Sequence, residues 1–197
     1  MLIGVLALQG AFIEHTNILN KLNIKNILIK NKDQVKLCDG IIIPGGESTS
    51  IGIIEENIFE ELRNHIIKGK IIWGTCAGMI LLANEIIGQK KDGQKNIGGL
   101  DVKIHRNYFG SQLNSFIKDI SYPKSFSKDG NYKAIFIRAP IILSVSSNVE
   151  ILNKLDNNLI IAVKQNNIIG TSFHPELTDN YSWHLYFINL IQNQINA

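Results

Sequence analysis

Cys76 has the sequence context of a reactive thiol. It lies in Gly74-Thr75-Cys76-Ala77-Gly78, between an apolar run and a stretch of helical periodicity. This spacing is typical of a nucleophile elbow, in which small residues permit a sharp strand-to-helix turn. The helix N-terminus favours a thiolate and offers backbone N–H groups to an oxyanion. We interpret Cys76 as a nucleophile and Ala77 as an oxyanion donor; the alternative for Cys76 is a buried structural cysteine. Cys38 has no such context, and we interpret it as a core residue.

A reactive thiol needs a base and a group that orients the base. The chain contains five histidines: His15, His65, His105, His174 and His184. Only His174 follows an apolar strand and precedes a proline, with Glu176 two residues further on. Residues i and i+2 of an extended segment point the same way, so the carboxylate can accept the imidazole N–H. The sequence therefore predicts a Cys76-His174-Glu176 triad. His65 is expected on a solvated helix face, and no Cys/His spacing fits a metal site.

A second candidate site is the segment Pro44-Gly45-Gly46-Glu47-Ser48-Thr49, between an apolar strand and a helical pattern. Two glycines allow the backbone to approach a ligand closely, and free amides can bind an anion or an oxyanion. Glu47 suits an ammonium group. The alternative is an ordinary Gly-rich turn. A Walker loop is excluded because the Gly-Lys-Ser/Thr ending is missing.

Short apolar runs alternate with helical patterns in the first half of the chain. We predict strands at Leu2–Leu8, Asn26–Lys30, Gly40–Ile43 and Lys70–Trp73. Helices are expected at Phe12–Leu22, from an N-cap at Ser48 to Ile67, and through Met79, Leu82 and Ile86. Uniformly apolar strands joined by helices favour a parallel sheet covered on both faces.

The second half of the chain is richer in strands. We predict them at Gly98–His105, Tyr132–Arg138, Val149–Lys154, Leu159–Gln165 and Asn167–Phe173, followed by a helix from Tyr181 to Gln194. Tight turns between these strands indicate an antiparallel extension of the sheet. Residues 107–131 are expected to form a surface excursion. With no linker and no repeat, the sequence predicts one α/β domain over residues 1–197.

Composition excludes several classes of protein. The chain has 197 residues, of which 45% are hydrophobic and 19% charged, with a formal net charge of +3. These values exclude disorder, and the small, scattered positive charge argues against a nucleic-acid partner. Two cysteines cannot build a disulfide scaffold. No apolar run is long enough to span a membrane, and the N-terminus has no basic region of a secretory signal. We therefore expect a cytoplasmic protein.

Six segments together resemble a known family: LALQGAF (6–12), PGGEST (44–49), GTCAG (74–78), RNYFGSQ (106–112), FIRAP (136–140) and FHPEL (173–177). They resemble class I glutamine amidotransferase domains and, more narrowly, the glutaminase subunits of pyridoxal 5′-phosphate synthases. The resemblance implies a flavodoxin-like three-layer sandwich: a central, mostly parallel sheet with helices on both faces and an antiparallel extension.

The resemblance also implies an activity: hydrolysis of L-glutamine to L-glutamate and ammonia through a thioester on Cys76. It places Gly45, Gly46, Glu47, Arg106, Ile137 and Arg138 around the glutamine. It assigns the oxyanion hole to Gly46 and Ala77. The ammonia would pass to the catalytic subunit of pyridoxal 5′-phosphate synthase, with Gln9 and His15 at or near that contact. No cofactor and no metal are implied.

Three alternatives remain at this point. The first is the glutaminase of imidazole glycerol phosphate synthase, which the segments 47–49 and 137–140 argue against. The second is a cysteine peptidase or esterase of related fold. The third is a binding module with a vestigial triad, and the complete set of Cys76, His174 and Glu176 argues against it.

Overall fold

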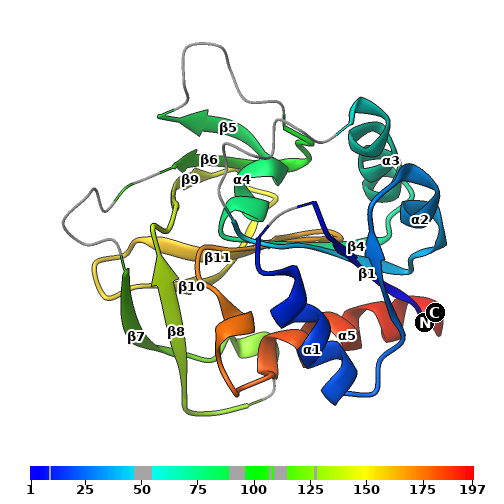
Figure 1. Ribbon diagram of the computed structural model, residues 1–197. Helices are drawn as coiled ribbons and strands as arrows, with labels where there is room; N and C mark the ends of the chain where they lie inside the picture. The colour runs from blue at the N-terminus through cyan, green and yellow to red at the C-terminus, as the bar shows by residue number, and fades with distance from the viewer. Residues whose placement is uncertain (9, 47–54, 89–95, 107, 109–114, 127) are drawn as a thin grey trace.

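A computed structural model of the chain describes residues 1–8, 10–46, 55–88, 96–106, 108, 115–126 and 128–197. Within these residues, a ten-stranded mixed sheet lies between two layers of helices (Figure 1). A further pair of strands forms a separate two-stranded sheet. The predicted α/β fold, with a mostly parallel sheet, helices on both faces and an antiparallel extension, is confirmed.

The parallel part of the sheet has the strand order β2-β1-β3-β4-β12. Its strands are β1 (Ile3–Leu6), β2 (Asn26–Ile29), β3 (Gly40–Ile43), β4 (Ile71–Thr75) and β12 (Ile168–Thr171). Neighbouring strands are parallel throughout, with Ile42 of β3 opposite Trp73 of β4. Ile41 and Ile43 enter one hydrophobic core and Ile42 the other. Burial of both faces explains why these strands are uniformly apolar.

The antiparallel extension continues from β12 through β11 (Ile160–Gln165) to β9 (Ile141–Val145) and β6 (Leu100–His105). β5 (Ala83–Ile87) pairs with β6 in parallel, and β10 (Glu150–Lys154) pairs with β11. The separate sheet consists of β7 (Ser115–Ser121) and β8 (Asn131–Ile137). This sheet brings Ile137 to Cys76.

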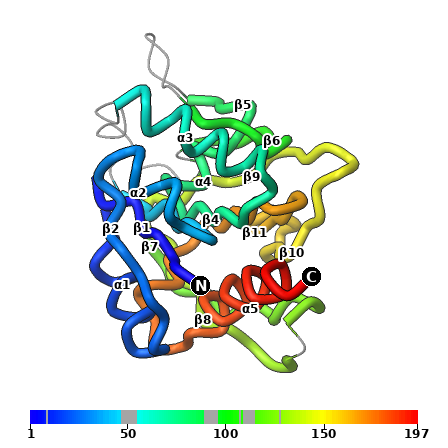
Figure 2. Tube along the Cα trace, turned by 90° about the vertical axis from the view of Figure 1, so that its right-hand side faces the viewer, coloured from blue at the N-terminus to red at the C-terminus, as the bar shows by residue number. Residues whose placement is uncertain are grey.

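Helices cover the two faces unequally. α1 (Phe12–Lys21) and α5 (Ser182–Ile195) lie on one face; α2 (Lys32–Leu37), α3 (Glu56–Ile67) and α4 (Ala77–Leu82) lie on the other (Figures 1 and 2). The first core contains Phe59 and Met79, and the second contains Trp73, Trp183 and Phe187. None of the helices in the described part of the chain is long and apolar enough to cross a membrane.

Several predicted boundaries are wrong. The helix expected through Ile86 ends at Leu82, because Ala83 has extended backbone and begins β5. The helix expected from Ser48 begins at Glu56, after an extended Glu55, and Ser48 itself lies outside the described residues. Within the expected surface excursion, residues 115–121 form strand β7, whose Phe116 stacks on Phe136 at 4.6 Å between ring centroids.

Gly78 offers a test of how closely α4 packs on the sheet. A Cβ atom at this position would overlap the carbonyl oxygen of Ile43 in β3. In an ordinary helix, Gly→Ala stabilises by about 0.5–1 kcal/mol. Here we expect the opposite sign: Gly78→Ala should lower the free energy of unfolding by about 2 kcal/mol or more, measured by urea denaturation.

Gly130→Ala is the comparison variant, because Gly130 has a φ of +101° but no atom within 4 Å of a built Cβ. It isolates the cost of backbone strain, about 1 kcal/mol. A Gly78→Ala protein as stable as the wild type would contradict the predicted close packing.

Candidate active site

Cys76 sits at the sharp turn between β4 and α4. Its φ of 48° and ψ of −108° are unusual for a residue other than glycine. The turn is held by a 2.7 Å hydrogen bond from its backbone N–H to the carbonyl oxygen of Thr171 in β12. Such strain persists where surrounding structure fixes it, most often at functional sites. The strand-turn-helix geometry expected of a nucleophile elbow is present.

Glycines give the turn its space. A Cβ at Gly74 would come 2.6 Å from backbone atoms of Gly78, across the turn. A Cβ at Gly45, after β3, would lie 2.7 Å from Cε1 of His174 and 3.0 Å from Cβ of Cys76. The backbone of Gly45 therefore lies directly against the side chains of Cys76 and His174. Any other residue at this position would collide with them.

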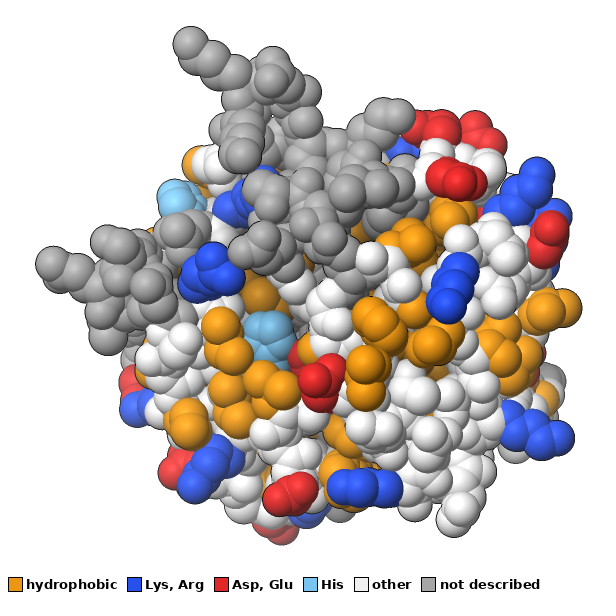
Figure 3. Space-filling view, viewed as in Figure 1, with side chains coloured by type: hydrophobic (Ala, Val, Ile, Leu, Met, Phe, Trp, Pro, Cys, Tyr) orange, Lys and Arg blue, Asp and Glu red, His pale blue; other side chains and the backbone are white. Residues whose placement is uncertain are grey.

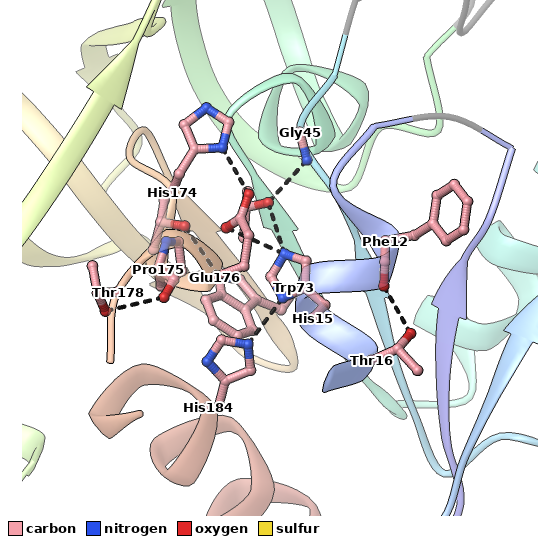
Figure 4. Close-up of polar contacts among 12 residues, drawn as sticks. Phe12, His15, Thr16, Gly45, Trp73, His174, Pro175, Glu176, Thr178 and His184 are labelled. Atoms are coloured by element: carbon pink, nitrogen blue, oxygen red, sulfur yellow. Dashed lines mark hydrogen bonds and ion pairs between the residues drawn. The ribbon is translucent and has the colours of Figure 1, made fainter. Parts of the chain in front are cut away.

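His174 and Glu176 form the predicted hydrogen-bonded pair. Nδ1 of His174 lies 2.7 Å from Oε1 of Glu176, and the Glu176 side chain is fully buried (Figure 4). A carboxylate only accepts, so Nδ1 carries the hydrogen and Nε2 is left for chemistry. Within the described residues, Nε2 has no hydrogen-bond partner of ordinary geometry. The geometry suits a base that Glu176 orients.

The charge state of His174 follows from its neighbours. Burial lowers the pKa of His174, but its interactions with Cys76 and Glu176 outweigh burial and raise the pKa to about 10. The imidazole is therefore protonated at neutral pH. A cation beside the sulfur of Cys76 stabilises negative charge there, the condition for a nucleophilic thiolate.

The other oxygen of Glu176 faces a second histidine. Nε2 of His15, on α1, lies 3.3 Å from Oε2 of Glu176 and 3.4 Å from Oγ1 of Thr75. Nδ1 of His15 lies 2.9 Å from Nε2 of His184, on α5. Figure 4 shows His174 and His15 approaching Glu176 from opposite sides. The side chain of His15 is fully buried under α1, so it cannot itself touch a partner, and the expectation that His15 lies at or near a partner contact stays a prediction.

Of the predicted oxyanion donors, Ala77 directly follows Cys76. Ala77 is the first residue of α4, where a backbone N–H has no partner within the helix. The N–H of Gly45 is already bound to Oγ1 of Thr75 at 3.0 Å, whereas Gly46 is exposed. The N–H of Gly45 is thus already engaged, and the assignment of Gly46 as a donor stays a prediction. The face drawn in Figure 3 has a hollow in which a histidine is visible, bordered by hydrophobic side chains.

The predicted substrate residues are placed unequally. The carbonyl oxygen of Ile137 lies 3.8 Å from Sγ of Cys76, and the exposed Arg138 follows it with a φ of 45°. Arg106 directly follows β6; it is half-buried, and burial lowers its pKa. Glu47 and Gln9, predicted to contact substrate and partner, lie outside the described residues.

His65 corrects another expectation. It is buried rather than solvated, with Nε2 3.2 Å from the carbonyl oxygen of Ile71. Burial lowers its pKa to about 4, so it is neutral. Both cysteines are free. In the part of the chain that the structure describes, no group of three or more His, Cys, Asp or Glu side chains could hold a metal ion.

Comparisons with known proteins agree on one family. A model of the SNO glutamine amidotransferase family matches residues 5–193. Pyridoxal 5′-phosphate synthase subunit PdxT of Carboxydothermus hydrogenoformans is 45% identical, covering 97% of this chain and 98% of its own. A probable pyridoxal 5′-phosphate synthase subunit PDX2 of Arabidopsis thaliana is 43% identical, covering 96% of this chain and 86% of its own. The crystal structure of a glutamine amidotransferase superimposes with a TM-score of 0.87 at 38% identity, covering 96% and 98%.

The thiolate condition can be tested by alkylation. We expect iodoacetamide at pH 7 to label Cys76, and His174→Ala to slow this labelling roughly tenfold by removing the neighbouring cation. Cys38 is an internal control, because burial raises its pKa to about 11. Peptide mass spectrometry separates the two sites. Equal labelling of Cys76 in wild type and variant would contradict the thiolate–imidazolium pair.

Buried neutral histidines predict how stability depends on pH. Burial, joined for His15 by repulsion from the neighbouring imidazoles of His184 and His174, lowers the pKa of His15. Burial also lowers the pKa of His65 to about 4 and that of His184 to about 3. Each titrates near ~6.5 when unfolded, so the unfolded chain binds more protons below that pH. We expect the urea concentration at the midpoint of unfolding to decrease as the pH is lowered from about 6.5 to about 4. In His65→Gln this decrease should be less steep.

His174 acts at the other end of the pH range. Because its pKa is raised to about 10, its contribution to stability is complete below about 6.5 and is lost as the pH rises toward 10. Stability should therefore be greatest near neutral pH. A His65→Gln protein with an unchanged acid slope would contradict the assignment of His65 as neutral.

Proposed function

Because the chain belongs to the SNO glutamine amidotransferase family, we propose that it hydrolyses L-glutamine to L-glutamate and ammonia and delivers the ammonia to the catalytic subunit of pyridoxal 5′-phosphate synthase. The observation that carries the proposal is the site itself. A cysteine on a strained elbow lies beside a protonated histidine, and a buried carboxylate holds that histidine.

The reaction is acyl transfer in two halves. The Cys76 thiolate attacks the γ-carboxamide carbon of glutamine, and the oxyanion is stabilised by N–H groups of Gly46 and Ala77. His174 gives its Nε2 proton to the amide nitrogen, the C–N bond breaks and ammonia leaves a thioester. His174 then takes a proton from water, whose oxygen attacks the thioester and releases glutamate.

Substrate recognition fits the charges available. The chain has three arginines, Arg63, Arg106 and Arg138, and two of them fall in the segments proposed to surround glutamine. A guanidinium can bind the substrate α-carboxylate through two parallel hydrogen bonds. Glu47 offers the complementary acceptor for the α-ammonium group. Arg138 adjoins the Ile137 carbonyl that faces Cys76, which favours it for the carboxylate.

The partner and its contact are part of the proposal. Relatives are named as subunits of pyridoxal 5′-phosphate synthase, and a subunit implies a partner. We propose that this partner is the catalytic subunit of the synthase. The exposed Ile13 of α1 and Leu177 beside the triad could give the contact apolar area. We place the protein, as one domain over residues 1–197, in the cytoplasm, where two free cysteines stay reduced.

Cys76→Ala tests the activity. In the presence of the synthase subunit, we expect glutamate release to fall by a factor of about 10³ or more, because no other group can form the thioester. Glutamate and ammonia are both quantified. Binding to the synthase, measured by sedimentation, should be unchanged, since Cys76 is only 6% exposed.

Cys38→Ala is the matched control: Cys38 is also buried, but its Sγ lies against Gly4 of β1 and the carbonyl oxygen of Gln34, and the variant is expected to keep full activity. Glutamate release by the Cys76→Ala protein at the wild-type rate would overturn the proposed function. So would peptide or ester hydrolysis by the wild type without any release of ammonia from glutamine.

A further inference from the structure

Two buried histidines have no role in the proposed reaction. His15 on α1 and His184 on α5 are both fully buried, and their rings lie with centroids 5.1 Å apart. Burial is the first cause that lowers the pKa of each, so both are neutral at physiological pH. They form a chain of contacts that begins in the second hydrophobic core, beside Trp73, and ends at Glu176.

The positions of the hydrogens in this series of contacts follow from the charge of Glu176. If Glu176 is ionised, its Oε2 can only accept, so Nε2 of His15 must carry the hydrogen. Nδ1 of a neutral His15 is then an acceptor and takes the Nε2 hydrogen of His184. This leaves Nδ1 of His184 without a hydrogen, and that atom indeed has no partner in the described part of the chain.

The opposite set of tautomers is worse on two counts. It would direct the lone pair of His15 Nε2 at a carboxylate oxygen 3.3 Å away. It would also bury an N–H donor on Nδ1 of His184 that no atom of the described residues accepts. Oε2 of Glu176 is buried and has no hydrogen bond of ordinary geometry among the described residues; Nε2 of His15 faces it at 3.3 Å and lies 3.4 Å from Oγ1 of Thr75.

We propose that His15 is a positioning residue: its Nε2–H fixes the Glu176 carboxylate from the side opposite His174, and His184 fixes the tautomer of His15. The proposal rests on the proposed function, because it assigns His15 to the same triad. Held through both oxygens, the carboxylate cannot rotate about its bond, so the ring of His174 keeps its Nε2 directed at the thiol.

The ionisable groups around Glu176 define what can disturb it. They are His174 with Cys76 behind it, His15 on α1, and Tyr132 on β8. His184 on α5 faces it through His15. Removing the His15 N–H withdraws a donor from the carboxylate and leaves Oε2 without any N–H facing it among the described residues. The carboxylate is then free to turn, and its hold on the imidazolium of His174 weakens.

His15→Leu is the first test, assayed with the synthase subunit present. We expect kcat to fall tenfold to a hundredfold with KM within about twofold, because positioning rather than binding is lost. The acid limb of kcat/KM should move up by about one pH unit. His15→Gln, whose amide can place an N–H near the same point, should restore most of both quantities.

His65→Gln is the matched control, since His65 is equally buried but bonds to Ile71 at the opposite end of β4. It should lose stability without moving the acid limb. If His15→Leu does not fold, His184→Phe keeps a ring against Trp73 and removes the donor. It should move the limb in the same direction. A wild-type limb in both His15→Leu and His184→Phe, or an equal shift in His65→Gln, overturns the proposal.

Nitrogen-15 NMR of labelled histidines tests the tautomers without reference to activity. We expect His15 and His184 to be neutral with the hydrogen on Nε2 at pH 7. A hydrogen on Nδ1 of His15, or a charged His15, overturns the proposal even if the protein is an active glutaminase. A protein with these tautomers and no glutaminase activity would instead refute the proposed function alone.

Discussion

The arrangement of the site depends on one buried charge. The Glu176 carboxylate has no solvent exposure, and a buried carboxylate is tolerated only when N–H donors surround it. His174 supplies one donor from its own segment and His15 faces the other oxygen from α1, some 160 residues earlier. The end of β12, α1 and α5 must therefore take fixed positions together, because a shift of any of them would leave this charge unpaired.

The sheet supplies the second constraint. β3, β4 and β12 are parallel neighbours, so their carboxyl ends meet at one edge and carry Gly45, Cys76 and His174 to the same place. Small residues allow that meeting: a side chain at Gly45 would displace His174, and one at Gly78 would push α4 away from β3. This close packing holds Cys76 in its strained backbone conformation, which has a positive φ.

Local patterns in the sequence were enough to predict the elbow and the His174–Glu176 hydrogen bond, because both involve residues within five positions of each other. The interior placement of His15 and His65 was not predictable, since it arises from contacts across the fold with Glu176 and Ile71. Strand β7 was missed because polar residues interrupt its alternation, and β9 because its five residues show no alternation at all. Helix α2 has six residues, too few for periodicity, although the Asn31–Gln34 capping box marked its start.

The four buried histidines show how position decides chemistry for one residue type. Desolvation is the first cause that lowers the pKa of His15, His65 and His184, so these three remain uncharged. His174 is also buried, yet it lies between a thiol and a carboxylate, and these interactions reverse the effect of burial. A neutral His15 can share Glu176 with a charged His174 without repelling it. A second cation there would compete for the carboxylate and weaken the hold on His174, so the neutrality of His15 is a condition for the charge on His174.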